Sequence, residues 1–262
     1  MSFPKSITLI GAGKLATHLG KQLQKTGLSI VGVWSRTGNS AKKLGTSLSC
    51  SYTSNLYKIP KADLYIIMVK DDAIASVAKK LSSVVDPKAL IVHTSGAVPS
   101  SVFMGHFEHY GVFYPLQSFS KKSAPDFKTI PFCIDANKKA DSSKLVSLAK
   151  QLSNVVHLVD DEQRGHLHLT AVFTNNFTNY LQFISAQLLK EQRLPYSIMQ
   201  PLLYETVRKL SDIAPREAQT GPAIRGDEKT MKKHSKLLEK QPEWRKLYEL
   251  LSEGITKDLK NK

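Results

Sequence analysis

An apolar run near the start of the chain leads directly into a turn of small residues. Ile7–Ile10 precedes Gly11-Ala12-Gly13, and Ala16 stands in the helix-like segment that follows. In a Gly-x-Gly-x-x-Ala turn the first glycine permits the tight turn, the second lets the backbone approach a pyrophosphate, and the third small residue lets the helix pack on the strand. The amides at the start of the helix then face the anion. This pattern predicts a dinucleotide site rather than a purely structural turn, with the contacts made by Gly11, Ala12, Gly13, Lys14 and Leu15.

The end of the second expected strand, Ser29–Trp34, predicts which dinucleotide binds. Sites that prefer NAD carry Asp or Glu about 20 residues after the glycine turn, where it accepts from the ribose 2′-hydroxyl. No acidic residue precedes Asp63 in this chain, and Ser35, Arg36 and Thr37 follow the strand instead. A guanidinium can bind phosphate oxygens in pairs. We therefore expect NADP, the alternative being that Arg36 is a solvated loop residue.

Two further strand ends should face the same cofactor, because ligands of an open α/β sheet lie beyond the carboxyl ends of its strands. Val69 and Lys70 are expected beside the adenosine-side ribose and the phosphates, and Thr94 and Ser95 at the nicotinamide end. His93 is a candidate general acid or base, because imidazole titrates near neutrality. The alternative for His93 is a hydrogen-bonded histidine that closes a strand.

A later helix-like segment carries amide side chains among apolar ones. His168, Asn175 and Asn179 are separated by seven and four residues and therefore share a helix face, with Asn176 beside them. These groups can bind a substrate or the nicotinamide carboxamide, or they can bridge helices in a dimer core. On the first interpretation His168 and Asn176 join His93 as catalytic candidates, and Asn175 and Asn179 bind substrate.

A loop rich in glycine and proline, Gln219–Asp227, separates two of the expected helices. Turn chemistry explains its glycines and its proline, but it does not explain the polar residues among them. Arg225 can clamp a carboxylate or phosphate, and Asp227 can orient Arg225 or cap the next helix. Thr220 and Arg225 are therefore candidate substrate-binding residues.

The pattern of apolar residues changes near residue 160. Before it, short apolar runs alternate with amphipathic segments, which predicts an α/β Rossmann domain with a parallel sheet over residues 1–160. After it, long periodic segments predict an all-helical domain over residues 161–262. Strands are expected at Ile7–Ile10, Ser29–Trp34, Leu64–Val69, Ala89–His93, Val112–Tyr114, Phe132–Ile134 and Val155–Val159. Helices are expected at Lys14–Lys25, Ser40–Leu44, Asp72–Leu81, Ser142–Leu152, His166–Gln192, Ser197–Ile213, Glu228–Leu238 and Pro242–Leu259. The helices after residue 160 make only a small hydrophobic core by themselves, and dimerisation through them would increase the buried apolar area.

Composition narrows the class of protein. The chain has 262 residues, 41% of them hydrophobic, which suits a folded globular protein. No apolar stretch reaches about 18 residues and no secretory signal is visible, so we expect a cytoplasmic protein without a membrane span. Cys50 and Cys133 form no Cys-x-x-Cys pair and are expected to be buried, and no histidine spacing suggests a metal site. The net charge of +15 comes from scattered lysines, which favours a solvated basic surface over nucleic-acid binding.

Five segments carry a resemblance that covers almost the whole chain. They are Gly11-Ala12-Gly13, His93–Ala97, Phe113–Phe119, the helix with Asn176-Phe177, and Thr220–Asp227. Together they resemble the Rossmann-like proteins with a C-terminal domain of unknown function. That group is similar to the superfamily of 6-phosphogluconate dehydrogenase, 3-hydroxyisobutyrate dehydrogenase, pyrroline-5-carboxylate reductase and deazaflavin-dependent NADP oxidoreductases. The resemblance implies an NADP-binding domain, an all-helical C-terminal dimerisation domain like that of 6-phosphogluconate dehydrogenase, and an active site in the cleft between them.

One feature of the related hydroxyacid dehydrogenases is missing. In those enzymes a catalytic lysine precedes an asparagine by one helical turn, but here the residues four positions before Asn175, Asn176 and Asn179 are Ala171, Val172 and Asn175.

The expected function is therefore an NADP(H)-dependent oxidoreductase that transfers a hydride between the nicotinamide and a small carbonyl or imine, with carboxylate-bearing substrates included. The alternative is a noncatalytic NADPH-binding sensor or scaffold. The missing lysine favours this alternative, whereas the crowding of polar side chains favours the enzyme.

Overall fold

The computed structural model describes residues 4–120 and 124–260, which form two compact units that divide after Asn176. Within these ranges no helix is long and apolar enough to cross a membrane.

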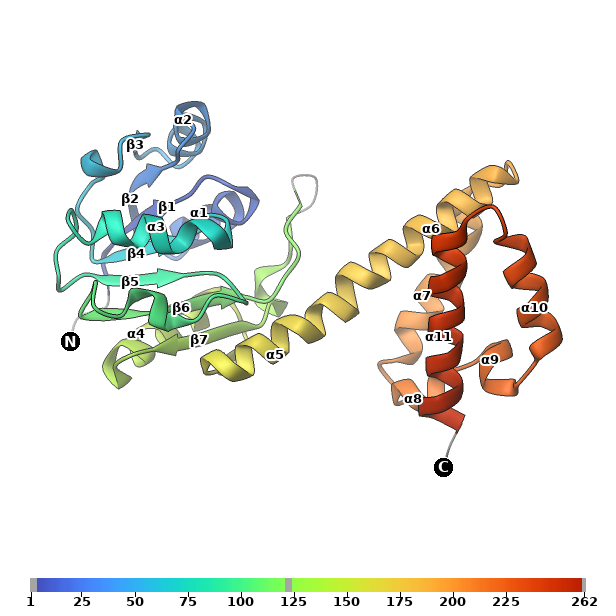
Figure 1. Cartoon of the computed structure of the whole chain (residues 1–262). Helices are drawn as coiled ribbons and strands as arrows, with labels where there is room; N and C mark the ends of the chain where they lie inside the picture. Colours follow the sequence, from blue (N-terminus) through green and yellow to red (C-terminus); the bar gives the residue numbers. More distant parts are fainter. Residues whose placement is uncertain (1–3, 121–123, 261–262) are drawn as a thin grey trace. The chain divides into compact units, whose positions relative to one another are not determined.

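The first unit is built on an eight-stranded sheet in the order β3-β2-β1-β4-β5-β6-β7-β8 (Figure 1). Its strands are β1 (Ser6–Ile10), β2 (Ser29–Trp34), β3 (Ser51–Thr53), β4 (Leu64–Ile67), β5 (Leu90–His93), β6 (His109–Pro115), β7 (Phe132–Ala136) and β8 (Val156–Leu158). The order places β1 between β2 and β4, as in a Rossmann fold, so the glycine turn lies near the centre of the sheet's carboxyl edge.

The sheet is parallel except where β6 meets β7, which run antiparallel. Gly111 lies opposite Ala136 in this pair, and a Cβ at Gly111 would collide with the carbonyl oxygen of Asp135. The expected parallel sheet is thus a mostly parallel one. Apolar periodicity predicts where a strand forms but not its direction, which depends on the connection between strands.

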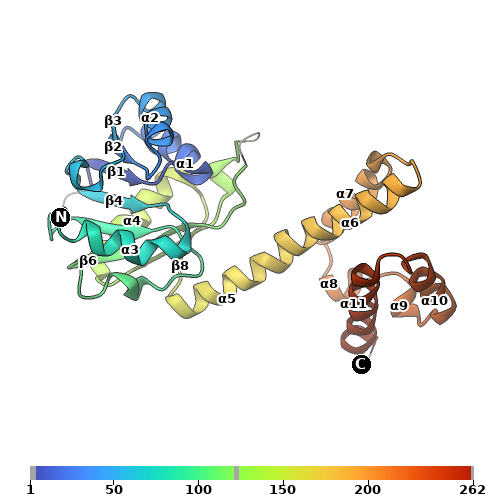
Figure 2. The ribbon, with the colours of Figure 1, turned by 45° about the horizontal axis from the view of Figure 1, so that its top comes forward.

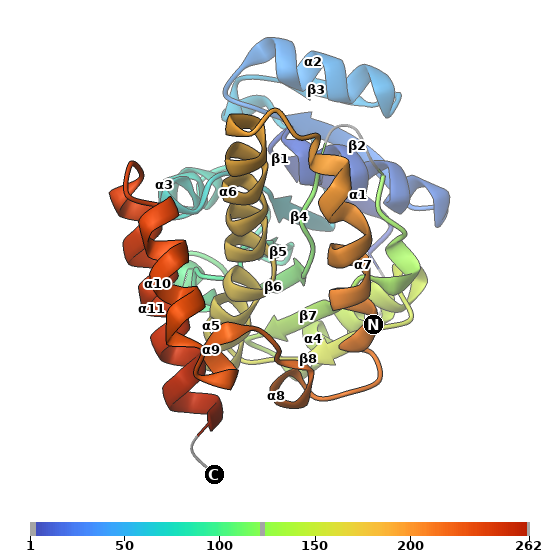
Figure 3. The same cartoon turned by 90° about the vertical axis from the view of Figure 1, so that its right-hand side faces the viewer.

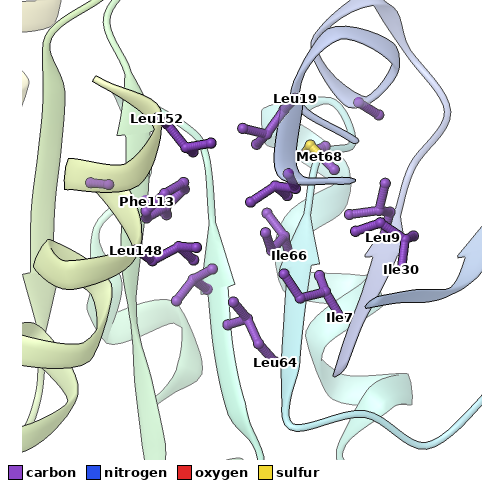
Figure 4. Packing of buried hydrophobic residues seen from close by; sticks show 14 of the residues in the cluster. Ile7, Leu9, Leu19, Ile30, Leu64, Ile66, Met68, Phe113, Leu148 and Leu152 are labelled. Carbon is purple, nitrogen blue, oxygen red and sulfur yellow. The ribbon is translucent and has the colours of Figure 1, made fainter. Parts of the chain in front are cut away.

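Helices cover both faces of the sheet. They are α1 (Lys14–Lys25), α2 (Gly38–Ser47), α3 (Asp71–Leu81) and α4 (Lys139–Leu152). On β4, Leu64 and Ile66 belong to one buried cluster with α1 and α4, whereas Tyr65 and Ile67 belong to the other cluster with α3. Figure 4 shows the first cluster, with Leu19 of α1 and Leu148 of α4 close to the strand residues. Alternate residues of one strand therefore supply two cores, which explains its continuous apolar sequence.

Two further features of this unit differ from the expectations. Strand β3 was not expected, because Ser51–Thr53 is a short edge strand without an apolar run. Cys133 is buried as expected, but Cys50 is only half-buried, since it follows α2 near the edge of the sheet. The other expected strands and helices of the first unit are present, with ends that differ by a few residues.

Helix α5 (Asp161–Ala171) begins earlier than the expected start at His166. The Asp160 carboxylate accepts a hydrogen bond from the backbone N–H of Gln163, and the Gln163 side chain accepts one from the backbone N–H of Asp160. This capping box starts the helix. Helix α5 belongs to the first unit and continues through a π-helical turn, Val172–Phe177, into α6 (Thr178–Glu191).

The second unit is entirely helical. After α6 come a short turn (Tyr196–Met199), α7 (Gln200–Lys209), α8 (Pro215–Ala218), α9 (Pro222–Arg225), α10 (Glu228–Leu237) and α11 (Pro242–Lys260). Figure 2 shows α9, α10 and α11 packed together, and Figure 3 shows the turn that joins α6 to α7. Ala223 and Leu238 are the only hydrophobic residues of this unit that are buried, among the side chains that the structure describes.

Candidate active site

The glycine turn has the geometry that a pyrophosphate site requires. Gly11 has a φ of +132°, and a Cβ there would collide with the carbonyl oxygen of Met68. Gly13 has no atom within 4 Å of its Cβ position, so its backbone is open on that side. Helix α1 starts directly after Gly13 without a side-chain cap, which leaves its first amides available to an anion.

Most of the predicted cofactor residues line one cavity of about 1040 Å³. We call it the nucleotide cavity. The residues predicted from sequence that line it are Gly11, Ala12, Gly13, Ser35, Arg36, Thr37, Val69 and Lys70. Lys14, Leu15, Thr94 and Ser95 do not line it. The ends of β1, β2 and β4 meet here because these strands are neighbours in the sheet.

Sequence reasoning missed two parts of this cavity. Ser54, Asn55 and Tyr57 come from the loop after the unexpected strand β3, and Ser76 and Lys80 come from α3. The loop is held by Asn55, whose side chain accepts a hydrogen bond from the backbone N–H of Tyr57 at 2.9 Å. The four-residue spacing of Ser76 and Lys80 on one polar helix face was an available signal.

The charge in the nucleotide cavity suits a phosphorylated ligand. Arg36, Lys70 and Lys80 all line it and are exposed. Arg36 follows β2, where a ribose 2′-phosphate lies in NADP sites of this fold, and Lys70 follows β4. Asp72, in the first turn of α3, is the acidic residue in the lining.

A second cavity of about 410 Å³ lies in the first unit between the end of β6 and the α5 segment. We call it the polar cavity. It brings together three of the predicted residues, His168, Asn175 and Asn176. Tyr114, Gln117 and Ser118 were not among the predicted site residues, although they lie in the Phe113–Phe119 segment that carried the resemblance. The rest of the lining consists of Leu116, Leu167, Thr170, Ala171, Val172 and Thr174.

Tyr114 and His168, which both line this cavity, are in polar contact. Tyr114 Oη lies 3.3 Å from His168 Nδ1. Both rings pack against Gly96, where a Cβ would lie 2.7 Å from His168 Nδ1 and 2.9 Å from Tyr114 Cζ. Burial raises the pKa of Tyr114 to about 12, so its hydroxyl is a proton donor at neutral pH.

His93 lines neither cavity. Its side chain is 0% exposed, and its Nδ1 accepts a hydrogen bond from the backbone N–H of Ser95 at 3.2 Å. Its ring centroid is 5.4 Å from that of Phe103. Burial, followed by the positive charge of Arg164, lowers the pKa of His93 to about 4. This geometry favours the alternative interpretation, a neutral histidine that closes strand β5.

The turn after β5 is held from both sides. The Ser95 hydroxyl accepts hydrogen bonds from the backbone N–H groups of Ala97 and Val98 at 3.1 and 3.0 Å. It is therefore committed to the turn. Arg164 of α5 is buried and donates from Nη2 to the carbonyl oxygen of Val98 at 2.6 Å.

Arg164 also anchors its own helix. The same Nη2 donates to Asp161 Oδ1 at 2.6 Å, and Asp161 accepts from the backbone N–H of Ser100 at 2.9 Å. These bonds attach the first turn of α5 to the segment after β5. His168 lies four residues after Arg164, on the same helix face, so the attachment positions His168 over Gly96.

Three predicted substrate-binding residues belong to the second unit. Asn179 on α6, Thr220 before α9 and Arg225 at the end of α9 are all exposed. Of the two interpretations of Asp227, the helix cap is confirmed. Its carboxylate accepts from Thr230 Oγ1 at 2.7 Å and from the Thr230 backbone N–H at 3.0 Å, and these bonds lower its pKa.

Comparisons with known proteins agree with this geometry. Residues 6–96 match a family model described as NADP oxidoreductase, coenzyme F420-dependent, and residues 130–255 match the domain of unknown function DUF2520. A Bacteroides fragilis protein provisionally assigned as an NADP oxidoreductase is 47% identical, with a TM-score of 0.92 over 96% of this chain and 98% of that one. A search of curated proteins found no match.

Two more distant structures share the fold. A Thermotoga maritima protein is 21% identical, with a TM-score of 0.76 over 94% of this chain and 98% of that one. An imine reductase from Myxococcus stipitatus, in complex with NADP⁺, is 15% identical, with a TM-score of 0.68 over 95% of this chain and 92% of that one.

The fold and the glycine-turn site define a Rossmann-fold oxidoreductase. Because the Bacteroides protein is 47% identical over nearly its whole length, the chain belongs to the same family, the Rossmann-like NADP oxidoreductases with a C-terminal DUF2520 domain.

The burial of His93 predicts a pH dependence of stability. An unfolded histidine titrates near 6.5, whereas folded His93 titrates near 4, so the unfolded state binds more protons between these values. The free energy of unfolding should therefore fall as the pH drops from 6.5 to 4, with about 3 kcal/mol of the fall due to His93. Urea unfolding across this range should show a smaller fall in His93→Gln. His106→Gln, at an exposed histidine, should keep the wild-type fall. An identical pH dependence in all three proteins would contradict the lowered pKa of His93.

Proposed function

We propose that this protein binds NADP(H) in the nucleotide cavity and transfers a hydride between the nicotinamide and a small carbonyl or imine compound in the polar cavity. The observation that carries the proposal is the nucleotide cavity itself, where Gly11, Gly13 and Arg36 meet. The imine reductase with the same fold was solved with NADP⁺, which supports both the cofactor and the substrate class. Bound NADPH supplies a hydride from its nicotinamide ring.

Each cofactor residue has a role in this proposal. Gly11–Leu15 holds the pyrophosphate at the start of α1, and Ser35, Arg36 and Thr37 bind the 2′-phosphate. Val69 and Lys70 contact the adenosine-side ribose and the phosphates. Thr94 and Ser95 shape the nicotinamide end through their backbone. The open backbone at Gly13 and the exposed cations of the cavity fit such a ligand.

Tyr114 and His168 supply the proton in this proposal. When a hydride adds to a carbonyl or imine carbon, the oxygen or nitrogen gains negative charge and needs a proton. The Tyr114 hydroxyl holds one at neutral pH, and His168 Nδ1 lies 3.3 Å from it. His168 is half-buried, so its ring is partly accessible to solvent. Asn176 orients the substrate, and His93 acts as a positioning residue.

Substrate binding by the second unit remains part of the proposal. Asn175 lines the polar cavity, and Asn179, Thr220 and Arg225 are the further candidates from the sequence. The exposed Arg225 guanidinium would serve a carboxylate-bearing substrate.

The cofactor assignment predicts a selective effect of Arg36→Ala. Loss of the guanidinium removes charge-assisted hydrogen bonds to the 2′-phosphate, worth about 1.5–3 kcal/mol, so NADPH binding should weaken about 10- to 100-fold. NADH binding should not change. Titration followed by reduced-nicotinamide fluorescence measures both. Lys43→Ala on α2, which removes an exposed charge outside the cavity lining, should bind like wild type. Equal NADPH and NADH affinity in the wild type would contradict the assignment.

The proton-donor assignment predicts a loss of turnover in Tyr114→Phe. Because the hydroxyl acts only in the chemical step, kcat should fall about 100-fold while NADPH affinity stays at the wild-type value. Tyr110→Phe is the matched control, since Tyr110 lies on the same strand but packs against Phe103 in the hydrophobic core and does not line the polar cavity. Steady-state NADPH oxidation and fluorescence titration give the two values. An unchanged kcat in Tyr114→Phe would remove the phenol from the mechanism.

We also propose a homodimer formed through the second unit. Many of its large hydrophobic side chains are exposed, while only Ala223 and Leu238 are buried among its described hydrophobic residues. Helices with so little core of their own need a further surface to cover their apolar faces, and a second copy carries the same faces. The exposed set includes Tyr180, Leu181, Phe183, Ile198, Leu202, Tyr204, Val207, Leu210, Leu250 and Leu251.

The dimer predicts a molar mass of twice 29.1 kDa by light scattering after gel filtration. The double variant Leu202→Lys/Tyr204→Lys places charge on α7 and should shift the mass toward that of the monomer. Met104→Lys, an equally exposed apolar position in the first unit, should leave the mass unchanged. A monomeric wild type at micromolar concentration would refute the dimer.

A further inference from the structure

We infer that the polar cavity selects an uncharged carbonyl or imine compound that carries a hydroxyl or carboxamide group, in preference to one that carries a carboxylate. The inference rests on the proposed function and names its substrate class. It follows from how the side chains that line the cavity already use their hydrogen-bonding groups.

The phenol and amide donors in the cavity are neutral. Tyr114 contributes a protonated phenol. Gln117, which lines the cavity, accepts at Oε1 from the backbone N–H of Ser118 at 2.7 Å, which orients the amide and leaves Nε2 as its donor. Asn175 Nδ2 lies 3.5 Å from Asn176 Oδ1, an arrangement that leaves Asn176 Nδ2 as a further donor.

Acceptors stand beside these donors. The hydroxyl of Thr170 donates to the carbonyl oxygen of His166 at 2.9 Å, and the hydroxyl of Thr174 donates to that of Thr170 at 3.1 Å. Their protons are committed to the helix, so their oxygens can only accept from a ligand. Asn175 Oδ1, an amide oxygen, is a further acceptor in the lining.

A mixed set of donors and acceptors suits a neutral polar ligand. An ionised carboxylate can only accept, so it would face the oxygens of Thr170, Thr174 and Asn175 without a proton between them. A hydroxyl or carboxamide both donates and accepts, and it can satisfy both kinds of group. Polar groups that lose water without gaining a partner cost binding free energy, which makes the cavity selective.

The two cavities of the first unit differ in the charge of the side chains that line them. The nucleotide cavity carries Arg36, Lys70 and Lys80, whereas the described lining of the polar cavity consists of amides, hydroxyls, a phenol, an imidazole and apolar side chains. The difference in lining separates a phosphate-binding region from a region for an uncharged ligand.

The test compares matched pairs that differ only in this group. Pyruvamide and pyruvate form one pair, and benzoylformamide and benzoylformate form a larger one. For the full-length protein, kcat/KM is measured by NADPH oxidation, and each compound is also titrated into the NADPH-bound protein with nicotinamide fluorescence as the readout. We expect the carboxamide to exceed the carboxylate at least tenfold in kcat/KM or in affinity.

Variants at Gln117 test the cavity directly. Gln117→Arg adds a cation and should move the carboxamide-to-carboxylate ratio at least tenfold toward the carboxylate. Gln117→Met, of similar length but without a polar group, should weaken both compounds and produce no such gain for the carboxylate. An unchanged ratio in Gln117→Arg would show that this cavity does not choose the substrate, and would overturn the inference.

The outcomes separate the inference from the proposed function. If NADPH does not bind, the proposed function fails and the inference fails with it. If NADPH binds and the carboxylate is equal or better, only the inference is overturned, and loss of that preference in Arg225→Gln would identify the anion clamp. If NADPH binds but neither member of a pair changes fluorescence or turnover, the substrate class is wrong while cofactor binding stands.

Discussion

The polar site depends on one buried attachment, the bonds from Arg164 to the segment after β5. A charged side chain is costly to bury unless it is paired and hydrogen-bonded, and Arg164 meets this condition at Nη2, which bonds to Val98 and Asp161. Its buried Nε and Nη1 have no hydrogen-bond partner among the described residues. Because the bonds join α5 to that segment, they determine where the next turn of α5 lies. The contact of His168 with Tyr114 over Gly96 follows from that position. Arg164 therefore positions the two residues to which we assign proton transfer, although it takes no part in that step.

The strand order explains why the two cavities have different chemistry. The ends of β1, β2 and β4 are neighbours and supply the glycine turn and the cations of the nucleotide cavity. The end of β6 lies further along the same sheet, where α5 brings imidazole, amide and hydroxyl groups to it. One sheet thus presents a cationic region and a region of amide, hydroxyl and imidazole groups, to which we assign the cofactor and the substrate respectively in our proposal.

The second unit has a different physical character. Helix α10 is capped at its start by Asp227, which accepts hydrogen bonds from Thr230. The tertiary core of the unit is nevertheless small, since only Ala223 and Leu238 are buried among the hydrophobic side chains described there. Capping stabilises a helix locally, whereas stability of the unit needs buried apolar area. This imbalance is the physical basis of the proposed dimer.

By itself the sequence determined the features that short segments encode. Periodicity placed most of the strands and helices, and the glycine turn at Gly11 together with the cation at Arg36 pointed to two strand ends that the structure brings to one cavity. The tertiary structure decided the direction of β7, the burial of His93 and the meeting of Tyr114 with His168. These features depend on contacts between segments far apart in the chain, and neither residue type nor local spacing specifies which distant groups will meet.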